Sequence, residues 1–103
     1  MTMQATATSP KTQVYPLFDV FESEAEFLLV ADLPGVTRPN LELAVEQGEL
    51  RLTAQSEGVE YRRSFKLGDD VDLDRIEAKL ELGQLEIHLH KQAASRMRKI
   101  EIK

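Results

Sequence analysis

The chain has 103 residues and no cysteine, so it supports one domain with a modest core, excludes disulfides and thiolate chemistry, and suits a reducing cytoplasm. Its formal net charge is −5, which argues against nucleic-acid binding because phosphate contacts need a basic face. No apolar run approaches the roughly 20 residues of a membrane helix, and the N-terminus has no secretory signal, so we expect no membrane partner.

Alternating apolar residues predict short strands along most of the chain. Residues 1–13 are rich in Thr, Ala and Ser and are expected to form a flexible arm. Gln47-Gly48 and Gly83 would each turn the chain between two strands, which predicts two hairpins. The predicted strands are 17–21, 27–33, 41–46, 50–54, 61–67, 76–82 and 85–90.

The remaining segments connect or follow these strands. Residues 68–75 are predicted to form an acidic loop with room for one helical turn, and no amphipathic helix of useful length is present. Many short strands at near-regular spacing indicate a β-sandwich or barrel. We therefore predict an all-β sandwich over residues 14–91 and a C-terminal extension over residues 92–103.

Four motifs occur in a fixed order. Residues 31–36 read Ala-Asp-Leu-Pro-Gly-Val, and residues 61–67 form an arginine-rich strand. Residues 78–85 follow an Ala-x4-Gly-x-Leu pattern, and the chain ends in Ile100-Glu101-Ile102-Lys103. Together these motifs resemble the small heat-shock protein (alpha-crystallin) family.

The resemblance implies a fold and a function. The fold is an immunoglobulin-like antiparallel β-sandwich, and the function is that of an ATP-independent holdase in the stress response. Such a chaperone assembles with itself, at least as a dimer, and holds partly unfolded client proteins so that they do not aggregate. By its place in the motif, Arg63 matches the family's arginine near the dimer interface, which pairs with acids. The simpler alternative is a surface ion pair worth about 0–1 kcal/mol.

The C-terminal motif predicts an apolar plug. Ile100 and Ile102 are two residues apart, so on an extended segment they point to the same side. The spacer over residues 92–99 reaches roughly 27 Å at most, which is enough to touch a neighbouring subunit. Residues 91–103 carry a charge of +4, which leaves −9 on the other 90 residues and favours contact between tail and body. The alternatives are that the tail docks to its own copy, that it docks to another copy, or that it forms a last strand of the same sandwich.

The plug needs a socket between the two sheets. By resemblance this groove lies between the strands over residues 41–45 and 76–82, and it would also receive clients. Its predicted residues are Leu41, Leu43, Val45, Ala78 and Leu80. Leu82 shares a face with Ala78 and Leu80, and the alternative is that all six are ordinary core residues. Ala78 matters most, because a small side chain leaves room for an isoleucine.

One connection departs from the family pattern. Bacterial and plant members of the family carry a long loop before the arginine-rich strand, with a strand that swaps into a partner. Here only residues 55–60 join the two strands, and six residues span at most roughly 21 Å. We therefore expect dimers to form through another surface, or only weakly.

The sequence gives no basis for catalysis. The two histidines, His88 and His90, share a strand face, but two ligands do not close a metal site. Residues 69–74 lack the glycine and terminal glutamate of an EF-hand. The glycines are isolated, so no phosphate cradle and no cofactor are expected. We predict a non-enzyme, and the alternative to a holdase is a CS-domain-like interaction or assembly module on the same sandwich.

Overall fold

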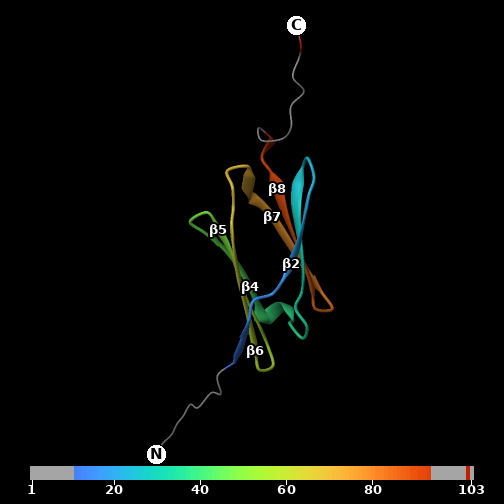
Figure 1. The fold of residues 1–103 in the computed structure, drawn as a ribbon, viewed down its shortest axis with the longest axis vertical. Helices are drawn as coiled ribbons and strands as arrows, with labels where there is room; N and C mark the ends of the chain where they lie inside the picture. The colour runs from blue at the N-terminus through green and yellow to red at the C-terminus, as the bar shows by residue number, and fades with distance from the viewer. Residues whose placement is uncertain (1–10, 94–101, 103) are drawn as a thin grey trace, which may run out of the picture.

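The computed structural model describes residues 11–93 and residue 102. In this part of the chain, eight strands form two four-stranded sheets with the orders β1-β6-β5-β4 and β2-β3-β8-β7, packed face to face (Figure 1). This arrangement confirms the predicted all-β sandwich. Within the described residues, no helix has the length and apolar character needed to cross a membrane. The elements are β1 (Thr12–Val14), β2 (Phe18–Glu22), β3 (Glu26–Asp32), η1 (Arg38–Asn40), β4 (Leu41–Glu46), β5 (Glu49–Ser56), β6 (Val59–Lys66), β7 (Val71–Glu81) and β8 (Gln84–Lys91).

The core follows from alternation along the central strands. Every second residue of β5 and β8 is buried, because successive side chains of a strand point to opposite faces. Leu50 and Leu52 from β5 meet Leu85 and Ile87 from β8 in one hydrophobic cluster. Burying each of these side chains contributes about 1.5–3 kcal/mol relative to exposure.

The first strand lies where the sequence predicted the arm. Thr12–Val14 pairs with Val59, Glu60 and Tyr61 of β6, and this is the one parallel pairing among the described strands. Thr12 N also donates to the carbonyl oxygen of Gly58 at 3.0 Å. The sandwich therefore begins before residue 14. Residues 1–10 of the expected arm lie outside the described residues.

The prediction of an acidic loop over residues 68–75 is wrong in its extent. β7 begins at Val71, which is buried at 4% exposure and pairs with Lys91 of β8. The register then shifts between Val71 and Ile76, which marks a bulge. Residues 69 and 70 form a turn in which Val71 N donates to the carbonyl oxygen of Gly68 at 3.2 Å, and from Val71 the backbone continues as a strand, so the stretch contains no helix. The short helix η1 was not predicted.

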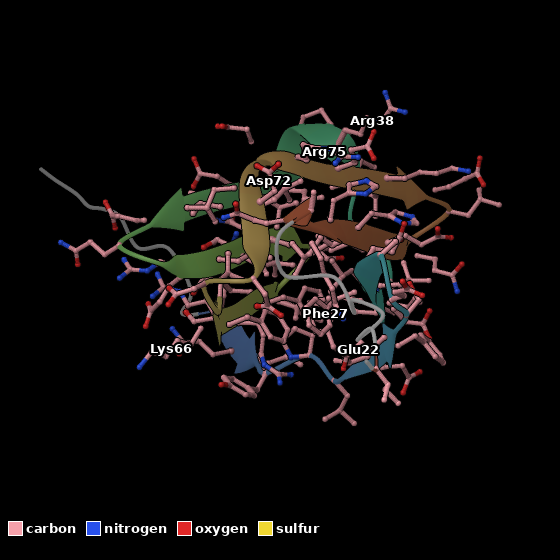
Figure 2. The ribbon with its side chains drawn as sticks, turned by 90° about the horizontal axis from the view of Figure 1, so that it is seen from above. Glu22, Phe27, Arg38, Lys66, Asp72 and Arg75 are labelled. Atoms are coloured by element: carbon pink, nitrogen blue, oxygen red, sulfur yellow. The ribbon has the colours of Figure 1, made fainter. Side chains whose placement is uncertain are left out.

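The sheet edges decide where a groove can form. Figure 2 looks along the sandwich and places β4 and β7 at one edge, with β1 and β2 at the opposite edge. The two strands expected to border the socket are therefore the edge strands on the same side of the molecule.

Candidate functional site

The predicted groove residues lie on the two edge strands. On β4, Leu41 and Leu43 are half-buried and pack against the core, whereas Val45 is 39% exposed. On β7, Ala78 is exposed and Leu80 is half-buried against the core. The apolar side of this edge is therefore partly open to solvent.

Sequence reasoning missed one apolar residue of this edge. Ile76 is half-buried and packs against the same core as Leu80. It precedes Ala78 by two residues, so strand alternation places all three side chains on one face. The period-two pattern that identified Ala78 and Leu80 therefore extends to Ile76.

Two of the sequence motifs meet at one corner of the sandwich. Leu33 N donates to the carbonyl oxygen of Gly83 at 2.6 Å, which joins the segment after β3 to the β7–β8 turn. Gly83 has a φ of +77°, and a Cβ there would lie 3.2 Å from the carbonyl oxygen of Leu33. The glycine is therefore required both by its backbone conformation and by the close approach of a second backbone. This contact holds the β7 end of the edge against the rest of its sheet.

Arg63 contacts other residues of its own chain. Its Nη1 donates to the carbonyl oxygen of Pro16 at 2.7 Å. The guanidinium also sits over three aromatic rings, 4.7 Å from the ring centre of Phe65, 4.9 Å from Tyr15 and 5.6 Å from Phe18. Within the described residues no carboxylate forms an ion pair with Arg63. The side chain thus links β6 to the connection between β1 and β2.

The two histidines join a carboxylate network on the outer face of one sheet. His88 Nδ1 lies 2.6 Å from Glu26 Oε1, and His90 Nε2 lies 2.8 Å from Glu77 Oε1. The hydrogen bond to Glu26 raises the pKa of His88, and the hydrogen bond from His90 lowers the pKa of Glu77. No cluster of three or more residues suited to hold a metal ion occurs in residues 11–93.

The plug is only partly within the described residues. Ile102 is 92% exposed, so its side chain is free to enter a socket. Ile100 lies outside the described residues. Of the predicted plug, Ile102 alone is thus placed by the structure.

A profile of the Hsp20/alpha crystallin family matches residues 19–103. The chain belongs to this family. The match spans the groove strands, Arg63 and the Ile-x-Ile tail, so every candidate residue lies within the Hsp20/alpha crystallin region.

Individual relatives agree with the family assignment. A probable 15 kDa heat shock protein from Leptospira interrogans is 34% identical over 91 residues, which cover 74% of this chain and 69% of that protein. The small heat-shock protein from Xylella fastidiosa is 30% identical, with a TM-score of 0.72 over 89% of this chain and 99% of that one. The hspA protein from Xanthomonas axonopodis is 30% identical, with a TM-score of 0.69 over 79% of this chain and 97% of that one.

In this Hsp20-family chain, β5 and the arginine-rich strand β6 are joined by a short turn. Ser56 pairs with Val59 and Gln55 pairs with Glu60, so Glu57 and Gly58 alone form the turn. Gly58 has a φ of +73°, a backbone conformation that glycine adopts without steric cost. No residue of this connection remains to build a strand that could pair with another copy.

Proposed function

We propose that this chain is an ATP-independent holdase that binds partly unfolded proteins in the cytoplasm and prevents their aggregation. Its membership of the Hsp20/alpha crystallin family supports a chaperone role. The observation that carries the proposal is the apolar rim at the β4 and β7 edge, where Leu41 and Leu43 of β4 and Leu80 of β7 are half-buried and Ala78 of β7 is exposed. Apolar attraction is non-directional, so such a rim tolerates clients of many sequences.

The same rim is proposed to bind the tail of another copy. Ile102 is 92% exposed, and Ile100 lies two residues before it, so both can enter one groove. Burying two isoleucine side chains contributes roughly 3–6 kcal/mol before ordering costs. Those costs make each plug weak and reversible, which suits an assembly that opens to receive clients. The partners are then further copies of this chain and unfolded proteins, with no cofactor and no catalytic step.

Light scattering of a heated client tests the proposal. Citrate synthase heated at a fixed rate would be mixed with increasing amounts of the full chain, without ATP. We expect scattering to fall in proportion to added chain, and adding ATP to change nothing. An inert protein of similar size and charge serves as the control. Unchanged scattering at a several-fold molar excess would contradict the holdase and favour the alternative, an interaction or assembly module on the same sandwich.

A further inference from the structure

A second hollow opens at the end of the sandwich where the chain leaves β8. Its volume is about 160 Å³, and apolar side chains from both sheets line most of it. Val20 stands at its mouth with 57% exposure, so the hollow is open to solvent. An apolar cavity of about 150 Å³ accepts a molecule the size of benzene. This pocket therefore has room for one branched aliphatic side chain. Its large apolar lining residues are Val20, Phe27, Leu29, Phe65, Leu67, Val71 and Leu89.

The start of the C-terminal extension is fixed at the rim of this pocket. Gln92 N donates to the carbonyl oxygen of Asp70 at 2.7 Å, and Gln92 Nε2 donates to that of Asp69 at 3.4 Å. Asp70 itself lines the pocket. Figure 2 looks onto this end, with Phe27 between Lys66 and Glu22. The C-terminal extension therefore begins at the opening of the pocket.

We propose that the pocket binds Ile100 of the same chain. Seven residue steps separate Ala93 from Ile100, a reach of roughly 24 Å at most, which is enough to turn back over the rim. Because Ile100 and the pocket belong to one molecule and a short segment joins them, the local concentration of Ile100 at the pocket is in the millimolar range. A single weak apolar contact can therefore form in many molecules when both sides belong to one chain. The same contact between two separate chains would form rarely.

Charge complementarity supports the tail as the occupant. The segment before Ile100 carries Arg96, Arg98 and Lys99. The rim carries Asp69, Asp70 and Glu22, and its cations are Lys66 and Lys91, of which Lys91 already pairs with Glu22 at 2.6 Å. Acidic side chains thus outnumber basic ones along the path that the basic segment must cross, which favours its return onto this end.

Such docking is an autoinhibitory contact. When Ile100 occupies the pocket of its own chain, the Ile-x-Ile pair cannot enter the β4 and β7 groove of another copy. The two sites then compete for one tail, and a higher chain concentration favours the second copy's groove. This docking determines where the tail rests in the free chain and does not depend on client binding.

Disulfide trapping tests the pocket directly, because the chain has no native cysteine. The pair Leu67→Cys with Ile100→Cys places one thiol at the pocket and one on the proposed occupant. The pair Leu82→Cys with Ile100→Cys is the control, since Leu82 is fully exposed in the β7–β8 turn. Under mild oxidation of a dilute sample, we expect the first pair to form an intramolecular bond at least tenfold faster. Equal rates would overturn the proposal.

Two further arms separate the pocket from the groove. The pair Leu43→Cys with Ile100→Cys should cross-link mainly between chains and only as the concentration rises. Mixing chains that carry Leu67→Cys alone with chains that carry Ile100→Cys alone should give little cross-linked dimer. Efficient bonding in that mixture, or bonding within one chain at Leu43 but not at Leu67, would overturn docking within one chain.

Discussion

Arg63 Nη1 donates to the carbonyl oxygen of Pro16 at 2.7 Å, so a residue of β6 holds the connection between β1 and β2. Three aromatic rings lie around the same guanidinium, and its Nε atom is buried with no hydrogen-bond partner. The resemblance implied a place near a dimer interface for this residue. The contacts within the chain give Arg63 a role in the fold that does not depend on a second copy.

We expect Arg63→Ala to lower the free energy of unfolding by about 1.5–3 kcal/mol, because a charge-assisted hydrogen bond is lost. Urea denaturation followed by circular dichroism measures this change. Arg62→Ala is the matched control, since Arg62 is 64% exposed and its ion pair with Glu60 at 3.4 Å contributes at most about 1 kcal/mol. A variant with unchanged unfolding but lower assembly mass would instead place Arg63 at an interface.

Stability should depend on pH through His88. Its pKa is raised in the folded chain by the hydrogen bond to Glu26, so the protonated form favours the folded state. This contribution is fully present below about pH 6.5, the ordinary value of histidine, and is lost as the pH rises through the raised folded pKa. We expect the difference in Tm between the native chain and His88→Gln to be larger at pH 6 than at pH 8.5.

Glu26→Gln provides the partner variant, since it removes the carboxylate and leaves the imidazole. It should reduce the same pH dependence, and an NMR titration should show the His88 pKa returning toward its usual range. Glu77 acts in the opposite direction. Its pKa is lowered, chiefly by the hydrogen bond from His90, so its contribution is present above about pH 4.5 and is lost as the pH falls through the folded pKa. A Tm difference that is constant from pH 5 to 9 would contradict the His88 assignment.

Gly83→Ala should be more destabilising than Gly48→Ala. Both glycines have a φ of +77°, so both variants incur the cost of a left-handed backbone, about 1–2 kcal/mol. Only at Gly83 would the added Cβ lie 3.2 Å from the carbonyl oxygen of Leu33, whereas nothing lies within 4 Å at Gly48. The difference between the two losses in unfolding free energy measures the cost of placing a Cβ against the Leu33 carbonyl oxygen. Equal costs would mean that this corner of the sandwich relaxes freely.

The strands were predictable where one face of a strand is buried. β5 and β8 alternate between apolar and polar residues, and that period alone defines both. The start of β7 was not predicted in this way, because Leu73 is exposed between two aspartates and the bulge before Ile76 interrupts the period. Among residues 71–75 only Val71 is buried, and its partner Lys91 is 20 residues away in sequence.

Tertiary contacts limited the site prediction in the same manner. Alternation placed Leu41, Leu43 and Leu80 on faces that the structure finds half-buried at the sheet edges. The bond from Arg63 to Pro16 joins residues 47 positions apart, and no local pattern encodes it. The pocket near Leu67 likewise depends on how the two sheets separate beyond the end of β6.

The tail is predicted to hold assemblies together without stabilising the fold. Ile100→Ala with Ile102→Ala should lower the assembly mass and leave the β-sheet content intact, because Ile102 is 92% exposed and is no part of the core. Light scattering after size-exclusion chromatography measures the mass, and circular dichroism measures the fold. Unfolding at a much lower temperature, with assembly unchanged, would show that the tail is a strand of its own sandwich.

Removal of residues 99–103 tests what the tail covers. If tail and client share the β4 and β7 groove, the truncated chain should bind more of a hydrophobic dye and should capture clients at least as well. Dye fluorescence at equal chain concentration measures the exposed apolar surface. Unchanged fluorescence would mean that the tail covers neither the groove nor the pocket.

Ala78→Arg tests the groove itself, because a long charged side chain at its rim should block both tail docking and client capture. Ala78 is exposed, so the fold should tolerate the change. Ala44→Arg is the matched control, since Ala44 is an exposed alanine on the opposite face of β4 from Leu43. Capture by the native chain should also be insensitive to moderate salt, because apolar attraction is not screened as surface charges are. Capture that disappears between 20 and 200 mM salt, about the range over which the screening length falls below 10 Å, would identify Arg96, Arg98 and Lys99 as the client-binding element instead.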